Sequence, residues 1–570
     1  MAVDTESNGL DNRWHPDSKT MGISISGPGV RAVNFPLRYV AHNIDPLLEQ
    51  PLFDVIQNHS RVVMHNAKHD IQALRDFGIE LKNTDYFDTM LGVHWINEEL
   101  QSKSLDYCST AYGGQPKNRP DLMKKIIKTM GWGMIPVELI NAYAANDAYI
   151  TGELYERIIG QFQKEGYEKG LWQVEREFID LINRMELLGV EIDTDLCEAE
   201  AMIGRGRMDE IVGKLGGLNP SSPQDMEELF LKQLGLPVHH ETDKGNPSFD
   251  KDAMEYYEAI LERRLDPTAQ LVFEYRGWQK TVSSNYEAYL KLLGTDGALH
   301  PNYKLHGART SRLSCEKPNL QQIPRSSTKR WNGNLKRAFV PRIGYRLWEA
   351  DYSNLEMRIA AAYSGDPRLI DTFNSGRNLF NDMAALLRGA TYSDQDRDDC
   401  KTLTYATLYG AGIDRIKDIF GISYDEARDK RNDFFGTYEG IASKTRHAGR
   451  VARGRGYVKV WTGRRRHFGK EAPTHKAFNA IIQGGGAEIL KRKMLILDKM
   501  IDWDECKMLL TVHDSIVFEI KQGREEYWHR IIRKVMTDVG SLHQGFSRLP
   551  FSIDIKEFGA KKCGCESCRG

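Results

Sequence analysis

The stretch Trp348-Glu-Ala-Asp-Tyr-Ser-Asn-Leu-Glu-Met-Arg-Ile-Ala360 decides the fold of the second half of the chain. The apolar run from Tyr345 to Ala350 predicts one buried strand, and the pattern from Leu355 to Ala362 predicts a helix with Ser353 as its cap. Asp351 lies between them, where a core strand should carry no charge, because burying a charge is costly unless it is paired or binds a metal. Taken alone, this aspartate is an ordinary helix cap. The rest of the chain favours a metal ligand instead.

Length and composition indicate a folded, multidomain protein outside the membrane. With 570 residues, 41% of them apolar, the chain is too long for one core, and roughly three to four domains are expected. No stretch is apolar enough to cross a bilayer, and the N-terminus lacks the basic start of a signal peptide. The eight cysteines are scattered except for Cys563, Cys565 and Cys568, which predicts a reducing, cytoplasmic setting. Those three lack a fourth zinc ligand, so a flexible tail is the simpler interpretation.

Positive charge is concentrated in two blocks, although the formal net charge is only −1. Residues 301–346 contain eleven Lys or Arg against one acid, Glu316, and residues 441–470 contain ten with no acid. Such runs are usually solvated faces. Here aromatic and glycine residues are interleaved with the charges, which favours surfaces that follow a phosphate backbone.

Acidic residues recur on separate predicted elements of the N-terminal third. The first eight residues read as a strand with Asp4 and Glu6 on one face. A second strand, residues 61–66, runs into a helix that carries Asp70 in its first turns. The Ala-rich segment 141–150 predicts a helix with Tyr143 and Asp147 one turn apart. These side chains could converge on two divalent ions.

In order and local spacing, the four acids and Tyr143 resemble the 3′–5′ exonuclease family that uses four acidic residues and a tyrosine. The resemblance implies an RNase H-like domain over residues 1–165. It also implies phosphodiester hydrolysis with two metal ions, in which Tyr143 orients the attacking water. The segment Phe87-Asp-Thr-Met-Leu91 matches the same family, where it is structural.

Residues 397–410 form the most specific pattern in the chain. Four side chains at intervals of four residues drift by about 40° per step and therefore share a stripe about 120° wide on a helix: Arg397, Lys401, Tyr405 and Tyr409. Two cations exclude a core face. The stripe offers charges to a triphosphate and rings to a base and sugar.

Further polar residues surround the predicted Asp351 strand. Met508 to Ile520 predicts a hairpin that turns at His513-Asp514-Ser515 and supplies Asp514 as a second carboxylate. Arg and Gln side chains can reach acceptors that every base pair presents in the minor groove, and Arg312 and Gln321 are placed there. Asn479 and Gln483 lie one helical turn apart and suit contacts to template or primer. An ordinary surface loop is the alternative for Arg312 and Gln321.

Asp351 to Arg358, Arg397 to Gly410 and Val512 to Ser515 resemble motifs A, B and C of family A DNA polymerases, the polymerase-I-like group. The resemblance implies an α/β multidomain fold, the exonuclease followed by a right hand. Residues 166–300, which predict helices, would form the thumb. Residues 301–390 would form the first part of the palm and 391–475 the fingers, with the rest of the palm and a tail in 476–570.

The resemblance also implies roles for these residues. Asp351, Tyr352 and Asp514 would hold two Mg²⁺ ions, with two more in the exonuclease and Mn²⁺ as an alternative. Arg397 and Lys401 would bind the triphosphate, and Lys401 would also protonate the leaving group. The remaining contacts would be Tyr405 to the sugar, Tyr409 beside the templating base, Glu356 against a ribose 2′-OH, and His513 to DNA.

Four positions depart from the family pattern. Ser515 replaces the usual glutamate after His-Asp, Phe380 replaces a histidine that contacts phosphate, and His475 replaces an arginine. Tyr405 stands where many members have phenylalanine, which predicts efficient use of dideoxynucleotides.

The expected partners are primer–template DNA, dNTPs and replisome proteins such as a helicase and a single-strand binding protein, with the chain a monomer. We expect no 5′ nuclease and a compact, phage-type replicative enzyme. A single-subunit RNA polymerase, and an exonuclease whose C-terminal half only binds DNA, are the alternatives. Glu356 and the editing domain disfavour the first, and the pair Asp351 and Asp514 disfavours the second.

Overall fold

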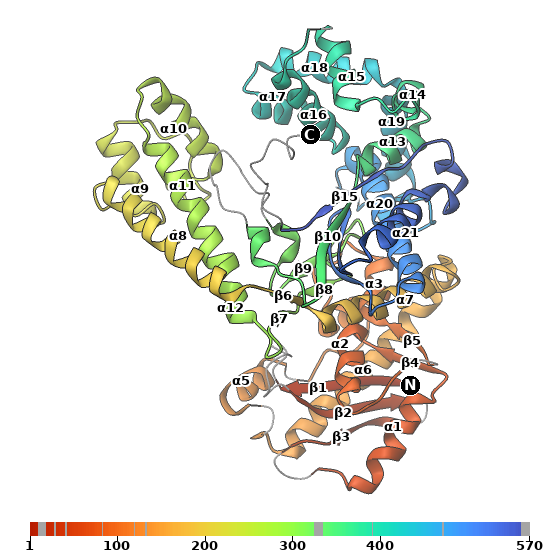
Figure 1. The fold of residues 1–570 in the computed structure, drawn as a ribbon. Helices are drawn as coiled ribbons and strands as arrows, with labels where there is room; N and C mark the ends of the chain where they lie inside the picture. The colour runs from red at the N-terminus through yellow and green to blue at the C-terminus, as the bar shows by residue number, and fades with distance from the viewer. Residues whose placement is uncertain are drawn as a thin grey trace. The chain divides into compact units, whose positions relative to one another are not determined.

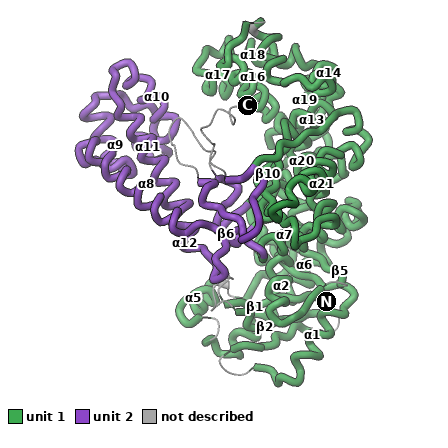
Figure 2. Tube along the Cα trace, in the orientation of Figure 1, with its two compact units in different colours: residues 1–187, 303–314, 349–556 green, residues 188–302, 315–348, 557–570 purple. Residues whose placement is uncertain are grey.

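The computed structural model describes residues 1–8, 19–27, 30–39, 43–81, 84–118, 120–131, 134–323, 335–389, 391–469 and 472–559. The cysteines of the predicted tail and part of both basic blocks lie outside these residues. The chain divides into two compact units (Figure 2). Unit 1 contains residues 1–187, 303–314 and 349–556, and unit 2 contains residues 188–302, 315–348 and 557–570.

The N-terminal part of unit 1 is built on a five-stranded sheet with the order β3-β2-β1-β4-β5 (Figure 1). The β1–β2 and β2–β3 pairs are antiparallel, whereas β4 runs parallel to both β1 and β5. The strands are β1 (Ala2–Asn8), β2 (Lys19–Gly27), β3 (Val30–Pro36), β4 (Arg61–Met64) and β5 (Asp85–Asp88). This mixed sheet with helices is the RNase H-like arrangement expected, and the two predicted strands are confirmed.

Helix α6 (Val137–Lys164) packs along β1, β2 and β3 and presents Asp147 to the sheet. Its apolar side, including Ile140, Ala144 and Leu154, is fully buried, as the helical period of the sequence requires. The other helices of this part are α1 (Glu49–Gln57), α2 (Ala67–Arg75), α3 (Thr89–Ile96), α4 (Leu105–Ala111), α5 (Pro120–Met130) and α7 (Leu171–Leu188).

Asp88 joins three elements at the end of β5. Its carboxylate accepts hydrogen bonds from the backbone N–H groups of Met90 and Leu91 at the start of α3, and from those of Asn66 and Ala67 at the start of α2. These contacts give the segment 87–91 the structural role expected of it.

The C-terminal part of unit 1 contains a four-stranded sheet with the order β13-β14-β10-β15. Its strands are β13 (Cys506–Val512), β14 (Ser515–Lys521), β10 (Tyr345–Tyr352) and β15 (Ile553–Glu557). The hairpin predicted around Asp514 is confirmed as the antiparallel pair β13–β14. The helices are α13 (Leu355–Ser364), α14 (Pro367–Asn374), α15 (Leu379–Arg388), α16 (Asp394–Leu408), α17 (Ile413–Phe420), α18 (Tyr424–Thr437), α19 (Glu439–Arg455), α20 (Ala477–Met500) and α21 (Glu525–Thr537).

The central strand β10 is longer than predicted and includes Asp351 and Tyr352. The prediction that Ser353 caps α13 is wrong. Asn354 occupies the N-cap in a left-handed conformation (φ +56°), and the Ser353 hydroxyl instead donates to Asp554 Oδ2 at 3.3 Å. A sharp turn directly after β10 requires the left-handed residue, and asparagine tolerates it better than serine does.

Helix α20 packs against α13 through Gly485 and Gly486, and the preceding Gly484 faces Val460. A Cβ at Gly485 would lie 3.5 Å from Ile359 Cγ2, and one at Gly486 would lie 3.5 Å from Leu355 Cδ2. At Gly484 a Cβ would come within 2.8 Å of Val460 Cγ1, so this position admits no side chain without movement. A Cβ at Gly485 or Gly486 would make ordinary contact with α13, and Gly484 is the position of the three that requires glycine.

Unit 2 has its own apolar core, in which Ile211, Met254, Tyr257 and Val272 are fully buried. The helices of this unit, together with α7, confirm the prediction that residues 166–300 are mostly helical. Ser222 and Asp250 cap two of the helices through side-chain bonds to backbone N–H groups, as their sequences suggest. The elements are β6 (Val190–Glu191), α8 (Thr194–Lys214), α9 (Pro223–Glu227), the π-helical turns Glu228–Gln233 and Val282–Tyr286, α10 (Lys251–Arg263), α11 (Thr268–Thr281), α12 (Glu287–Leu292) and β7 (Ala298–Leu299).

Candidate functional sites

Three acids meet where β1 faces α6. Carboxylate oxygens of Asp4, Glu6 and Asp147 lie within 4.8 Å of one another. Asp4 and Glu6 share a face because β1 alternates with period two. Burial, then the neighbouring Asp147, raises the pKa of Asp4 to about 8, and burial also raises the pKa values of Glu6 and Asp147. Such mutual repulsion makes the site favourable for a cation.

The donor set fits a divalent ion. In the described part of the chain, Glu6 Oε1 and Asp147 Oδ1 are buried and have no hydrogen-bond partner. Oxygen ligands of this kind are those that Mg²⁺ and Mn²⁺ prefer. Tyr143 lies one turn before Asp147 on α6, and burial, then Asp147, raises the pKa of its phenol to about 12.

Asp70 is near these acids but does not belong to the group within 4.8 Å. Its Oδ1 accepts a 2.7 Å hydrogen bond from the hydroxyl of Thr5. Asp70 nevertheless contributes to the raised pKa of Glu6. The convergence predicted from the sequence is therefore close for three of the four acids.

Lys117 is the residue of this site that sequence reasoning missed. Its Nζ lies 2.5 Å from Asp147 Oδ2 and 5.4 Å from the centre of the Tyr143 ring. It comes from the irregular segment between α4 and α5, which has no helical or strand period that could have identified it.

The second cluster of acids lies where β10 ends and β14 begins. Asp351 is the second-last residue of β10, and Asp514 lies in the turn between β13 and β14. The N–H of Tyr352, the last residue of β10, donates to the Asp514 carbonyl at 3.4 Å. Burial raises the pKa of Asp514 to about 6. Arg312 opposes this shift, and Glu356 and Asp351 add to it. The two aspartates predicted to meet are thus neighbours, and a cation between them would relieve their repulsion.

Two residues predicted in this cluster take unexpected contacts. The Tyr352 hydroxyl donates to the Met536 carbonyl at 2.7 Å, so only its main chain is available as a metal ligand. Arg312 forms ion pairs with Glu356 and, at 3.5 Å, with Asp514 Oδ1. An arginine expected in the DNA groove therefore pairs with two acids of this cluster.

Ser515 occupies the position at which the family has a third carboxylate. Its hydroxyl lies 3.3 Å from Oε1 of Glu349, a buried residue on the adjacent strand β10. Glu349 also pairs with Lys556 at 3.4 Å. An acid therefore remains next to the Asp514 turn, two residues before Asp351.

The stripe on α16 is exposed in part, as predicted. Lys401 is exposed, and Arg397, Tyr405 and Tyr409 are accessible. The rings of Tyr405 and Tyr409 lie 5.9 Å apart, and Tyr405 lies 6.0 Å from Phe380. Lys401 Nζ lies 5.8 Å from the Phe380 ring. Phe380, one of the departures from the family pattern, is buried and therefore packs beneath this stripe.

Tyr409 links the stripe to α13. Its hydroxyl donates a 2.7 Å hydrogen bond to Glu356 Oε2. Glu356 is buried and also accepts from Arg312. The side chain predicted to exclude a ribose hydroxyl is thus held from two sides.

The predicted DNA contacts are spread over several elements. Asn479 and Gln483 lie in the first turns of α20 and are partly accessible, and Asn479 Oδ1 has no hydrogen-bond partner in the described residues. His513 is exposed in the Asp514 turn, with φ +56°. Gln321 lies in a short 3₁₀ helix (Leu320–Gln322) of unit 2, and its backbone N–H bonds to Asn319.

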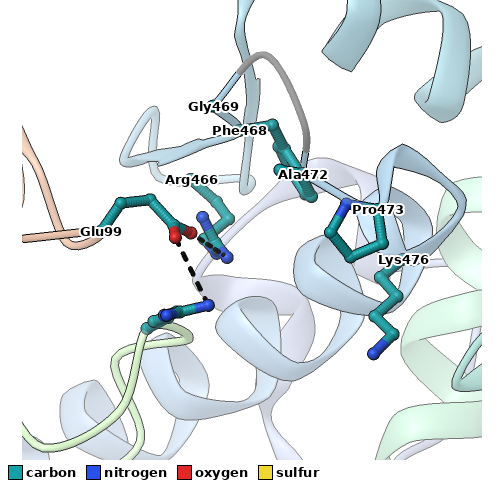
Figure 3. A pocket seen from close by; sticks show the side chains of 8 residues that line it. Glu99, Arg466, Phe468, Gly469, Ala472, Pro473 and Lys476 are labelled. Carbon is teal, nitrogen blue, oxygen red and sulfur yellow. Dashed lines mark ion pairs between the residues drawn. The ribbon is translucent and has the colours of Figure 1, made fainter. Parts of the chain in front are cut away.

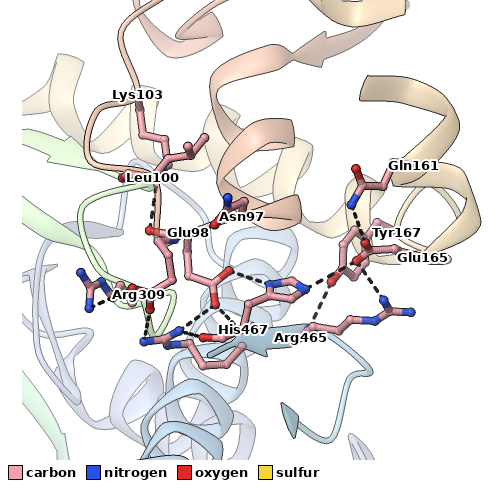
Figure 4. Close-up of polar contacts among 12 residues, drawn as sticks. Asn97, Glu98, Leu100, Lys103, Gln161, Glu165, Tyr167, Arg309, Arg465 and His467 are labelled. Atoms are coloured by element: carbon pink, nitrogen blue, oxygen red, sulfur yellow. Dashed lines mark hydrogen bonds and ion pairs between the residues drawn. The ribbon is translucent and has the colours of Figure 1, made fainter. Parts of the chain in front are cut away.

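Charged side chains join the exonuclease part to the hairpin of β11 (Tyr457–Lys459) and β12 (Arg465–His467) (Figure 4). Glu98, which follows α3, accepts from the His467 backbone N–H and lies 2.9 Å from His467 Nδ1 and 3.1 Å from Arg466 Nη1. Glu165 pairs with Arg465 at 3.3 Å. The Glu98 side chain is only 3% exposed, so this is a built junction and not a chance surface contact.

A cavity of about 530 Å³ opens beside this junction (Figure 3). It is lined by three cations, Arg309, Arg466 and Lys476, and by Glu99, which pairs with Arg309 at 3.4 Å and Arg466 at 2.6 Å. Lys476 directly precedes α20, the helix that carries Asn479. The cavity therefore places Lys476, and two arginines paired with Glu99, close to the start of the helix that carries the predicted DNA contacts.

Two segments of the chain match known protein families. Residues 192–557 match the model of DNA polymerase family A, and residues 1–162 match that of the 3′–5′ exonuclease. The chain belongs to DNA polymerase family A.

Several bacterial proteins are similar to it. DNA polymerase I of Chloroflexus aurantiacus is 29% identical over 83% of this chain and 52% of its own length. DNA polymerase I of Mycobacterium tuberculosis is 30% identical over 83% of this chain and 54% of its own. The chain thus spans about half the length of these relatives. Among solved structures, the POL domain of Pol1 from M. smegmatis, in complex with DNA primer-template and dNTP, has a TM-score of 0.82 at 22% identity, covering 98% of this chain and 95% of that one.

Proposed function

We propose that this protein extends a DNA primer on a template with dNTPs and removes 3′-terminal nucleotides at a separate exonuclease site. The proximity of Asp351 and Asp514 carries the proposal, since these two acids lie near Tyr405 of the α16 stripe. Burial, then Glu356, Asp514 and Asp351, raises the pKa of Tyr405 to about 12, which reflects this proximity.

The side chains suit nucleotidyl transfer in the following way. Arg397 and Lys401 bind the triphosphate, and Lys401 gives a proton to the departing pyrophosphate. Tyr405 packs on the sugar, and Tyr409 lies beside the templating base. Two Mg²⁺ ions held by Asp351, Asp514 and the Tyr352 carbonyl, with Mn²⁺ as an alternative, would supply positive charge to the primer 3′-oxygen and the phosphates.

At the exonuclease site, Asp4, Glu6 and Asp147, with Asp70 as an outer acid, would hold a second pair of ions. Tyr143 orients the attacking water through its hydroxyl, whose raised pKa keeps it protonated at neutral pH. The accessible duplex contacts are Arg312, Gln321, Asn479, Gln483 and His513.

The domain boundaries form part of the proposal. Residues 1–165 are the exonuclease, 166–300 the thumb, 301–390 and 476–570 the palm with its tail, and 391–475 the fingers. The helical core of unit 2 supports the thumb, and helices α16 to α19 support the fingers.

The wider role is also a proposal. Replication of a phage genome, a monomeric enzyme, cytoplasmic location, and helicase and single-strand binding partners all stay predictions. Within the described residues, no helix combines the length and apolarity that crossing a bilayer requires.

A primer-extension assay tests the function. Asp351→Ala should abolish extension and keep digestion of the primer without dNTPs, and Asp4→Ala should do the reverse. Asp425→Ala, on the exposed face of α18, is the matched control and should change neither activity. Loss of both activities in either single variant would contradict two separate sites. Extension with rNTPs as efficient as with dNTPs would indicate an RNA polymerase instead.

A further inference from the structure

Lys117 is held in place by its main chain as well as by its charge. Its N–H donates to Asp106 Oδ1 at 2.7 Å. Two residues earlier, Gln115 accepts from the Ser109 hydroxyl at 2.7 Å and donates its N–H to Glu153 Oε2 at 3.1 Å. The segment is thus fixed to both α4 and α6, and these contacts hold the Lys117 ammonium beside the acids.

The Lys117 ammonium is largely removed from solvent. Its side chain is 20% exposed and that of its partner Asp147 is 5% exposed. Desolvation lowers the pKa of Lys117, but Asp147, Tyr143 and Asp4 outweigh this, so the net pKa is raised and the group stays charged. Lys117 in turn lowers the pKa values of Asp4 and Glu6 against the effect of burial. The single positive charge of Lys117 therefore opposes the repulsion among Asp4, Glu6 and Asp147.

We propose that Lys117 is the internal counter-cation of the exonuclease acids and competes with the divalent ion for Asp147. The inference rests on the proposed exonuclease function. Asp147 Oδ2 is held by Lys117, while its Oδ1 and Glu6 Oε1 have no hydrogen-bond partner in the described residues. An ion that binds the cluster must share or displace the ammonium, so the metal affinity is lower than the acids alone would give.

This competition affects editing and leaves synthesis alone. No contact joins Lys117 to Asp351 or Asp514 in the described structure, so it would raise the metal concentration needed for digestion only. The balance between removal and addition of nucleotides would then follow the concentration of free divalent ion.

The test measures metal binding directly. In the full-length chain carrying Asp351→Asn and Asp514→Asn, Mn²⁺ is titrated into metal-free protein and followed by calorimetry and by the resonance signal of free Mn²⁺. Lys117→Met should lower the Kd at the exonuclease site by about tenfold, as expected for losing a competing unit charge in a buried site. Lys117→Arg keeps the charge and should stay near the wild-type Kd. Lys124→Met, on the exposed side of α5, is the matched control.

Unfolding provides a second measurement. Without metal, Lys117→Met should melt at a lower temperature than the parent, because the acids lose their counter-charge, and saturating Mn²⁺ should reduce the difference. If Lys117→Met does not fold, Lys117→Gln serves in the same comparison.

Equal Kd values for the parent, Lys117→Met and Lys117→Arg would overturn the inference, as would weaker binding in Lys117→Met. If neither the parent nor any Lys117 variant binds Mn²⁺, while Asp147→Asn behaves like the parent, the proposed metal-dependent exonuclease fails instead. The two failures are therefore distinguishable.

Discussion

The Tyr409 hydroxyl donates a 2.7 Å hydrogen bond to Glu356 Oε2, connecting the end of α16 to the start of α13. Tyr409 is 39% exposed, whereas Glu356 is 4% exposed. An accessible ring thus fixes the orientation of a buried carboxylate at the proposed sugar position.

Glu356→Ala should reduce discrimination against ribonucleotides by at least about tenfold, because the buried side chain that would exclude the 2′-OH is removed. The measurement is the ratio of kcat/KM for dNTP and rNTP in single-nucleotide extension. Tyr409→Phe keeps the ring, loses the hydrogen bond and should give a smaller change in the same direction. An unchanged ratio in Glu356→Ala would show that selection lies elsewhere.

Tyr405 should make the enzyme an efficient user of dideoxynucleotides. Its hydroxyl can stand in for the missing sugar 3′-OH, so Tyr405→Phe should lower kcat/KM for ddNTPs by about tenfold or more while that for dNTPs changes little. The comparison requires an Asp4→Ala background to prevent digestion. Similar ddNTP use by both proteins would refute the role of the hydroxyl.

The buried pair of Lys491 on α20 and Glu175 on α7 predicts a stability effect. Both side chains are at most 3% exposed, and Lys491 Nζ lies 2.8 and 2.9 Å from the two carboxylate oxygens. Lys491→Met leaves a buried charge unpaired and should cost about 3–5 kcal/mol in urea unfolding of the full chain. Adding Glu175→Leu should restore most of the loss. Equal stability of the single and double variants would contradict a dominant electrostatic cost.

Asp88 predicts a pH dependence of stability. Burial raises its pKa from 3.8 to about 6, despite four backbone hydrogen bonds that lower it. The folded state therefore binds more protons between these values, and stability falls as pH rises through this window, by up to about 3 kcal/mol. Asp88→Asn should flatten this part of the profile of urea midpoint against pH. A parallel profile in both proteins would exclude Asp88 as the source.

Much of both sites was predictable because regular periods encode it. The two-residue alternation of β1 places Asp4 and Glu6 together, and the four-residue spacing on α16 places Arg397 to Tyr409 on one face. The meeting of Asp351 and Asp514 could be expected only through resemblance, since nothing local in the sequence pairs β10 with β14.

The remainder depends on contacts that no period encodes. Lys117 comes from an irregular segment, and Thr5 holds Asp70 from a neighbouring element. Asn354 replaces Ser353 at the helix start because the chain turns more sharply there than residue preferences indicate. Tertiary packing decided each of these outcomes.

The glycines of α20 link the selection of the sugar to the binding of the duplex, two properties that a kinetic assay would treat as unrelated. The same helix carries Asn479 and Gln483 in its first turns and then passes against Leu355 and Ile359, the neighbours of Glu356 on α13. A residue larger than alanine at Gly485 or Gly486 would push the two helices apart and shift the Glu356 carboxylate away from the incoming sugar. Discrimination between dNTPs and rNTPs and affinity for the duplex would then change together, so natural variants with reduced sugar selection should also bind the duplex less well.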